Sequence, residues 1–386
     1  MSRSRPRASS NGQHGNGRAQ AHPRRTPDAP EPPGGVTVIT GGAGFVGANL
    51  AHRIATGGGE VVLFDSLARP NVQLNAQWLR EQHGRRVSLV VGDVRDAAAV
   101  RRVIARADRV FHFAAQVAVT TSLVDPVTDF AVNAGGTLNV LEAVRAQGRE
   151  IPVFFTSTNK VYGSLADVPL EMRARRWEPQ DASLAVTGVS EGRPLDFHSP
   201  YGCSKGAADQ MMLDWARSYG MPAVVLRMSC VYGPRQFGTE DQGWVAHFLI
   251  RALRGEPIVL YGDGRQVRDL LYVDDLMEAM LRALEDIEIA RGHAFNVGGG
   301  PTNTVSLVEL LELAEELGGR RPELSHAPVR VGDQRWYVSD PRKIGDALGW
   351  SPRTDVRRGV ERLLSWLRDP SRLAPRLRPV IDGVAE

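Results

Sequence analysis

The sequence predicts an α/β protein with a doubly wound parallel sheet and a smaller α/β lobe in its C-terminal half. Three observations favour this fold class. Short apolar runs alternate with amphipathic helical segments, as strands and crossover helices do in parallel sheets. A glycine cluster, GGAGFVG at 41–47, directly follows the first apolar run. With 386 residues, the chain is long enough for a second lobe.

The predicted strands are runs of Val, Ile, Leu and Phe that end on small or polar residues. They lie at 36–40, 60–65, 87–93, 109–115, 153–158 and 223–229. Most runs are apolar along their length instead of alternating, which is typical of strands buried on both faces. We therefore expect one sheet with helices on both sides.

The remaining segments define the predicted domain organisation. Residues 35–232 form the sheet domain, with a polar insertion or lid at about 164–198 over the mouth of the sheet. Residues 233–368 form the smaller, substrate-binding lobe, with helices at 306–317 and 356–367. The ends of the chain, 1–34 and 369–386, are predicted to be a disordered basic tail and a loose C-terminal tail.

Positive charge is concentrated at the N-terminus. Residues 1–25 hold six arginines and no acid, and the rest of the chain has 41 basic and 44 acidic residues. The sequence pI of about 9.0 therefore reflects the tail. Because this tail has no aromatic residues for base stacking, we expect no nucleic-acid partner.

Composition also bears on the location of the protein. Hydrophobic residues make up 42% of the chain, but no run approaches the roughly 18 apolar residues of a membrane helix, so no membrane partner is expected. Two cysteines, Cys203 and Cys230, are too few for a disulfide framework. This favours a reducing, cytoplasmic location.

The spacing of Gly41, Gly44 and Gly47 between a strand and a helix predicts a dinucleotide site. Glycine permits the tight turn and the close approach of a diphosphate, which the N–H groups at the helix N-terminus then bind. Asp65 ends the next strand, where its carboxylate can accept hydrogen bonds from the adenosine ribose. An acid at this position favours NAD over NADP, so we predict a Rossmann-type NAD-binding domain.

Further cofactor contacts are expected where later strands end. Asp93 is positioned to receive the adenine amino group, although capping of the following helix is an alternative. Ala114, Ala115 and Gln116 end the fourth strand on mostly small residues that let a ribose pass close to the backbone. The other predicted cofactor contacts are Phe45, Val46, Val94 and Asn133.

Tyr201 and Lys205 lie four residues apart and therefore on one face of a helix. A free phenol titrates near ~10, so a tyrosine base needs a nearby positive charge to act near neutrality. Lys205 and an oxidised nicotinamide can supply it. Thr158, at the end of a predicted strand, is the third hydroxyl, and it would orient a substrate alcohol. We predict this set as the catalytic residues, with no metal.

The motifs TGGAGFVG, VYG at 161–163 and YGCSK at 201–205, with Thr158, resemble the extended short-chain dehydrogenase/reductase family of NAD-dependent epimerases and dehydratases. The resemblance covers about residues 36–368. It implies action on nucleotide-diphosphate sugars, catalytic roles for Thr158, Tyr201 and Lys205, and NAD that stays bound and is recycled in each turnover. Relatives usually assemble through helices of the large domain, so a homodimer or homotetramer is expected.

Longer segments resemble one subgroup, the sugar 2-epimerases that convert CDP-paratose to CDP-tyvelose. These segments are STNKVYG at 157–163, DFHSPYGCSKGAADQ at 196–210 and YGPRQFGTEDQGW at 232–244. In the last segment Glu240 stands where the subgroup usually has an aromatic residue. The resemblance implies an isomerase that inverts carbon 2 of a nucleotide hexose by transient oxidation to a 2-ketone and re-reduction.

The resemblance also implies contacts to the substrate. Arg268 and Arg330 occupy positions that clamp the two phosphates in this family, with surface ion pairing as the alternative. His198 is a candidate second acid–base group, with loop packing as its alternative. The other predicted substrate contacts are Thr120, Asn159, Arg235 and Gln236.

Three other functions are alternatives to a 2-epimerase. Dehydration of a nucleotide hexose needs an acidic pair after Thr158, and this chain has Asn159 and Lys160 there, so dehydration is disfavoured. A 4-epimerase stays open, because the same residues can oxidise whichever carbon the pocket presents. A catalytically idle NAD-binding sensor is the alternative from another class. The motifs leave the nucleotide base and the sugar open.

Overall fold

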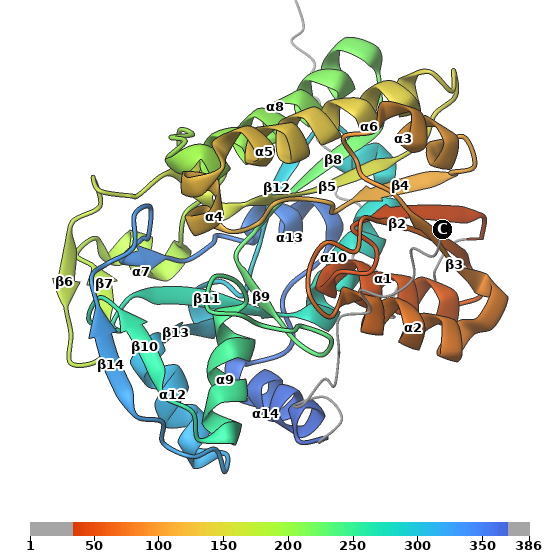
Figure 1. Ribbon diagram of the computed structural model, residues 1–386. Helices are drawn as coiled ribbons and strands as arrows, with labels where there is room; N and C mark the ends of the chain where they lie inside the picture. The colour runs from red at the N-terminus through yellow and green to blue at the C-terminus, as the bar shows by residue number, and fades with distance from the viewer. Residues whose placement is uncertain (1–33, 370–386) are drawn as a thin grey trace, which may run out of the picture.

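The computed structural model describes residues 34–369 and contains a Rossmann-type sheet with a second lobe beside it (Figure 1). The central sheet has seven strands in the order β12-β8-β5-β4-β1-β2-β3, and all its pairings are parallel. This confirms the predicted fold class. Except for Gly34 and Asp369, the two predicted tails lie outside the described residues.

Six strands of this sheet lie where the sequence predicts them, and the seventh, β12, adds to the edge next to β8. The strands are β1 (Val36–Thr40), β2 (Glu60–Asp65), β3 (Val87–Val91), β4 (Arg109–His112), β5 (Val153–Thr158), β8 (Ala223–Met228) and β12 (Ala294–Val297).

Helices cover both faces of the sheet (Figure 1). One face carries α3 (Ala97–Ile104), α4 (Val119–Val124), α5 (Pro126–Phe130), η2 (Ala131–Gly135), α6 (Gly136–Arg145) and α8 (Ser199–Tyr219). The other face carries α1 (Phe45–Thr56), α2 (Val72–His83) and α10 (Val273–Glu285).

Neighbouring strand residues face opposite sides of the sheet and enter different cores. Phe154 belongs to the core beneath α1, whereas Phe155 belongs to the core beneath α6. This is why the strands are apolar along their whole length. The edge strand β3 departs from the prediction, since Leu89, Val90 and Val91 are exposed on a strand with only one neighbour.

The second lobe is built on a four-stranded sheet and a parallel strand pair. Its elements are β9 (Cys230–Tyr232), β11 (Val267–Tyr272), β13 (Thr304–Ser306) and β15 (Trp336–Tyr337), the pair β10 (Ile258–Tyr261) and β14 (Leu324–Ala327), and the helices α9 (Trp244–Arg254), α12 (Leu307–Glu316) and α14 (Val356–Leu367). Helices α12 and α14 match the predicted helices to within a residue, and a capping box from Ser306 and Glu309 starts α12.

The chain crosses between the two parts more often than the predicted boundary at residue 233 allows. Before that boundary, β9 already pairs with β11 of the second lobe. After it, β12 returns to pair with β8, and α10 packs beside α1. One cut therefore cannot separate the lobes, because each lends strands or helices to the other.

The segment 164–198 contains the hairpin β6 (Leu170–Met172) and β7 (Trp177–Pro179) and the helix α7 (Ala182–Thr187). Leu165 and Val168 share a core with Val267 and Trp336 of the second lobe. Its apolar residues are thus buried against the second lobe, and the role of this segment as a cover for the mouth of the sheet stays a prediction.

Shorter helices complete the chain: η1 (Gly84–Arg86), η3 (Asn159–Tyr162), α11 (Ile287–Ala290), η4 (Pro301–Asn303) and α13 (Arg342–Leu348). In the part of the chain from 34 to 369, none of the helices has the length and apolar character that a membrane crossing requires.

Two glycines of the turn after β1 are required by close packing. Gly41 has φ +68°, and a Cβ there would lie 2.7 Å from the amide nitrogen of Ala114. A Cβ on Gly47 would lie 2.5 Å from the carbonyl oxygen of Gly41. Both obstacles are backbone atoms, which cannot move aside without distorting the turn.

We predict that Gly47→Ala lowers the free energy of unfolding by about 1–3 kcal/mol, because the new methyl group overpacks the turn. Urea unfolding followed by circular dichroism measures this change. Gly135→Ala is the matched control, because its Cβ would meet no atom closer than 3.9 Å. Equal stability of the two variants would contradict the packing argument.

Candidate active site

Helix α8 brings Tyr201 and Lys205 to the carboxyl end of β5. The Lys205 Nζ donates to the carbonyl oxygen of Thr156 at 2.7 Å and lies 3.9 Å from the centre of the Phe155 ring. The hydroxyl of Tyr201 is hydrogen-bonded to Thr158. All three predicted catalytic side chains are buried and lie together at one end of the sheet.

A buried ion pair anchors this helix one turn beyond Lys205. Asp209 accepts two hydrogen bonds from the Arg227 guanidinium on β8, at 2.8 and 2.9 Å. Arg227 also donates to the hydroxyl of Tyr162 at 3.2 Å, and Tyr162 donates to Asn296 of β12 at 2.7 Å. Helix α8 is therefore held to β8, η3 and β12 through polar groups.

Burial shifts the pKa values of Tyr201 and Lys205 in opposite directions. It raises the pKa of Tyr201 to about 12; the Thr158 hydrogen bond lowers this value and the charge of Asp129 raises it. Burial lowers the pKa of Lys205 to about 7, against the raising effect of Asp209 and Asp129. The surrounding protein thus keeps the Tyr201 phenol protonated at neutral pH. The expected lowering of the Tyr201 pKa by Lys205 is not produced by the protein residues alone.

The turn between β1 and α1 offers an anion site. Gly44 is the N-cap of α1, so no side chain caps the helix, and the first turn of α1 holds no acid. Asp65 accepts hydrogen bonds from the N–H groups of Ala43 and Leu67, both at 2.9 Å. Burial raises the pKa of Asp65 more than these bonds lower it.

Asn133 connects the loop after β4 with the catalytic helix. Its Oδ1 accepts from the N–H of Gln116 at 2.9 Å, and its Nδ2 donates to Ser204 at 3.0 Å. Asp129, which sequence reasoning missed, accepts hydrogen bonds from Gln116, Asn133 and Ser204. Only its burial distinguishes this acid from an ordinary helix carboxylate, and burial cannot be read from its sequence neighbours.

Asp93 follows β3 and forms a bidentate ion pair with Arg95. The Arg95 Nε donates to both carboxylate oxygens at 3.1 Å. The hydrogen bond from Arg95 lowers the pKa of Asp93. The alternative capping role is wrong, because Asp96 accepts the N–H groups of Ala98 and Ala99 at the start of α3.

The roles of the remaining predicted cofactor contacts stay predictions, and the structure gives their positions. Val94 is buried against Gly136, Phe45 and Val46 begin α1, and Ala114 and Ala115 follow β4.

A pocket of about 270 Å³ opens beside the catalytic residues, between the two parts of the protein. Thr158, Tyr201 and the predicted substrate contacts Thr120, Asn159, Arg268 and Arg330 line it. Residues that sequence reasoning did not single out for the site also line the pocket, among them Lys160, Asp241, Trp244, Tyr261 and Asp333. Of the described lining residues, none comes from the segment 164–198.

Both predicted phosphate-binding arginines are engaged by carboxylates. Arg268 lies 2.6 Å from Asp333, which is also 3.8 Å from the Lys160 Nζ. Arg330 lies 2.9 Å from Glu240. Burial and the charge of Arg268 lower the pKa of Lys160 to about 8, although Asp333 opposes the shift.

Three predicted substrate contacts do not line this pocket. His198 lies 2.9 Å from the carboxylate of Asp196 and is half exposed. The Arg235 guanidinium lies 3.6 Å above the Trp78 ring, where the cation–π attraction favours it. Gln236 donates to the carbonyl of Val231 at 3.2 Å. These residues are close in sequence to residues that line the pocket, but their side chains contact other groups outside it.

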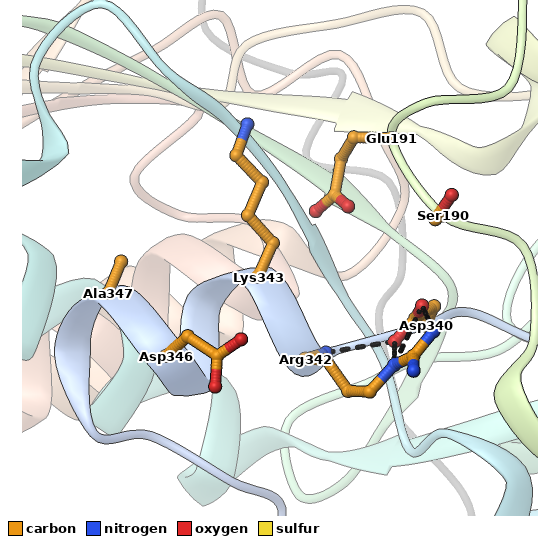
Figure 2. Close-up of a pocket in the computed structure, with 7 residues that line it drawn as sticks. All are labelled: Ser190, Glu191, Asp340, Arg342, Lys343, Asp346 and Ala347. Carbon is orange, nitrogen blue, oxygen red and sulfur yellow. Dashed lines mark hydrogen bonds and ion pairs between the residues drawn. The ribbon is translucent and has the colours of Figure 1, made fainter.

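A second hollow, of about 540 Å³, lies away from the catalytic residues around the start of α13 (Figure 2). Its lining is mostly charged, and Arg342 forms an ion pair with Asp340 at 2.6 Å across its edge. Lys343 donates to the carbonyl of Ala294 at 2.8 Å. Because Thr158 and Tyr201 line the smaller pocket and not this hollow, we assign the chemistry to the smaller pocket.

The sheet order, the glycine turn and the Thr158–Tyr201–Lys205 cluster together define an extended short-chain dehydrogenase/reductase. Residues 37–298 match the family described as NAD dependent epimerase/dehydratase, and the chain belongs to this family. NAD is the cofactor of the family, and the residues fit it: the uncapped start of α1 suits a diphosphate, and Asp65 suits ribose hydroxyls.

Individual relatives carry several activities. The chain is 42% identical, over 85% of its length and 98% of the relative, to a CDP-paratose 2-epimerase from Salmonella typhi. It is 32% identical, over 86% of its length and 92% of the relative, to a dTDP-glucose 4,6-dehydratase from Mycolicibacterium smegmatis. A UDP-glucose 4-epimerase from Thermus thermophilus, solved in complex with NAD, is 34% identical with a TM-score of 0.73, covering 87% of this chain and 99% of that one.

We predict that Lys205→Met changes how stability depends on pH. The pKa of Lys205 is about 7 in the folded protein against an ordinary 10.5, so between these values the unfolded chain binds the extra proton. The contribution of Lys205 to the unfolding free energy therefore rises with pH, by on the order of 2 kcal/mol from pH 7 to 9.

Urea unfolding of both proteins at pH 7, 8 and 9 measures this effect. The difference, wild type minus variant, should grow with pH. Lys160, whose pKa is also lowered, is present in both proteins and cancels. A difference independent of pH would contradict a lowered lysine pKa at this position.

Proposed function

We propose that this protein is an NAD-dependent nucleotide-sugar epimerase that inverts carbon 2 of a CDP-hexose, as in the conversion of CDP-paratose to CDP-tyvelose. One observation carries the proposal: the two residues that follow Thr158 in the pocket are Asn159 and Lys160, and not an acidic pair. The 42% identity to a CDP-paratose 2-epimerase supports the choice of carbon and nucleotide.

Carbon 2 of a hexose carries a C–H bond with no carbonyl beside it, so direct deprotonation is too costly. When bound, NAD supplies a hydride acceptor and donor, so a secondary alcohol can become a ketone and then an alcohol of the opposite configuration. We propose that Tyr201 accepts the hydroxyl proton and later returns it. Thr158 orients the same hydroxyl by a hydrogen bond, and Lys205 places positive charge near the phenol as the proton leaves.

The residues next to Thr158 disfavour dehydration. Asn159 has no proton to donate as an acid, and its Nδ2 is directed at Gln334 at 3.3 Å. Lys160 donates to the carbonyl oxygen of Gly332 at 2.9 Å. The pocket carboxylates Glu240 and Asp333 are each paired with an arginine. We therefore assign Asn159 to hydrogen bonding with the sugar and Lys160 to electrostatic stabilisation.

The arginines of the second lobe are assigned to the substrate diphosphate. Arg268 and Arg330 line the pocket from the second lobe, and a guanidinium fork matches phosphate oxygens. Thr120, from α4, completes the proposed substrate contacts.

Incubating the purified protein with CDP-paratose, without added NAD, tests the proposal by NMR. We expect CDP-tyvelose to form, with no deuterium at carbon 2 when the solvent is D₂O, because internal hydride return excludes exchange with solvent. Inversion at carbon 4 of a nucleotide sugar would favour the 4-epimerase. A failure to convert any CDP-, GDP- or UDP-hexose would favour an NAD-binding sensor.

Tyr201→Phe should lower kcat by about 10²–10⁴-fold, because the proposed acid–base group is lost. Its fold should persist, since the ring that packs in the site is unchanged. Tyr219→Phe is the matched control, because Tyr219 is exposed at the far end of the same helix. Full turnover by Tyr201→Phe would contradict the assigned role.

We propose that two copies of the chain associate through α4, α5 and α6. On these neighbouring helices Val124, Val127 and Phe130 are 85%, 78% and 55% exposed, and Leu138 is also exposed. Apolar groups of this size gathered at one site are typical of an interface. We also propose a cytoplasmic location, because Cys203 and Cys230 are both free thiols.

Phe130→Asp should shift the protein from dimer to monomer in light scattering coupled to size-exclusion chromatography, because it places a charge on the proposed interface. Ile289→Asp, a similar change at an exposed residue of α11, is the control. A dimer that survives Phe130→Asp would contradict this interface.

A further inference from the structure

The loop between β9 and α9 contacts Arg330, the arginine that we assign to the substrate diphosphate. Glu240 accepts from Arg330 twice, through its backbone carbonyl at 3.0 Å and its carboxylate at 2.9 Å. Asp241 lies 3.6 Å from the same guanidinium. The Arg330 side chain is 24% exposed, so this contact is partly shielded from water.

The same loop is held to three other parts of the protein. The hydroxyl of Tyr261 on β10 donates to the Glu240 carboxylate, and the Tyr261 ring lies 3.7 Å from the Arg330 guanidinium. Asp241 accepts from the hydroxyl of Thr120 on α4 at 2.9 Å. Gln242 accepts from Arg69, which follows β2.

A guanidinium binds phosphate best through two N–H groups in one plane. In Arg330, Nη1 and Nη2 both donate to Glu240, while the ring of Tyr261 covers one face. An incoming phosphate must therefore compete with the Glu240 backbone carbonyl for Nη1 and with the Glu240 carboxylate for Nη2. The hydrogen bond from Tyr261 and the charge of Arg330 also lower the pKa of Glu240, so the competitor is ionised at neutral pH.

We propose that Glu240 is an internal competitor for the anion-binding donors of Arg330 and sets the affinity of this enzyme for a nucleoside diphosphate. The proposal rests on the proposed function only in that the substrate carries a diphosphate. Binding of the diphosphate displaces the Glu240 carboxylate, and the loop that carries Asp241 and Gln242 adjusts with it. An uncharged nucleoside does not need these donors, so Glu240 does not affect its binding.

Isothermal titration of wild type and Glu240→Gln with CDP, inorganic pyrophosphate and cytidine tests this proposal. Glutamine keeps the shape of the side chain and removes its charge. We expect Glu240→Gln to bind CDP and pyrophosphate about 2- to 5-fold more tightly, the range of one partly exposed ion pair. Cytidine should bind both proteins equally.

Glu256→Gln is the matched control, because Glu256 pairs with Arg251 at 3.1 Å outside the pocket. It should leave all three affinities unchanged. Unchanged or weaker binding of CDP and pyrophosphate by Glu240→Gln would overturn the proposal, as would equal tightening for cytidine or no anion binding by either protein. The assay needs no turnover, so failed epimerisation alongside tighter anion binding would count against the proposed function alone.

Discussion

Helix α8, which carries the proposed catalytic residues Tyr201 and Lys205, is held in place by the buried ion pair between Asp209 and Arg227. Two charges removed from water are costly unless their hydrogen bonds are complete, and here the pair is bidentate and extended through Tyr162 to Asn296. It joins α8 to strands that lie far apart in the sequence. The same acid, one turn from Lys205, supports the charge of that lysine in a site that otherwise disfavours it.

The pocket exists because the chain crosses between its two parts. After β8 the chain leaves the central sheet and forms β9, which pairs with β11, and β12 later extends the central sheet beside β8. The proposed catalytic hydroxyls therefore come from the end of β5 and from α8, whereas the cationic side chains Arg268 and Arg330 come from the second lobe. In the proposed function, this arrangement would hold a diphosphate and a reacting sugar carbon at set positions relative to each other.

Charge balance within the pocket limits what it can bind. Lys160, Arg268 and Arg330 are matched by Asp333, Glu240 and Asp241, so the pocket is nearly neutral without an anion. Affinity for a diphosphate then depends on which carboxylates can move away. Both acids lie on loops, but the Glu240 carboxylate is paired with one cation, Arg330, whereas Asp333 is paired with two, Arg268 and Lys160, and is therefore held more strongly.

The strand positions, the glycine turn and the Tyr201–Lys205 pair follow from local sequence, because apolar runs, a left-handed turn and a four-residue helical spacing are local properties. Three features were decided only by the tertiary structure. Strand β12 pairs with β8, Arg235 stacks on Trp78 and does not face the pocket, and Glu240 forms an ion pair with Arg330. Those outcomes depend on which partner is nearest in space, and long-range proximity and burial are not encoded in neighbouring residues.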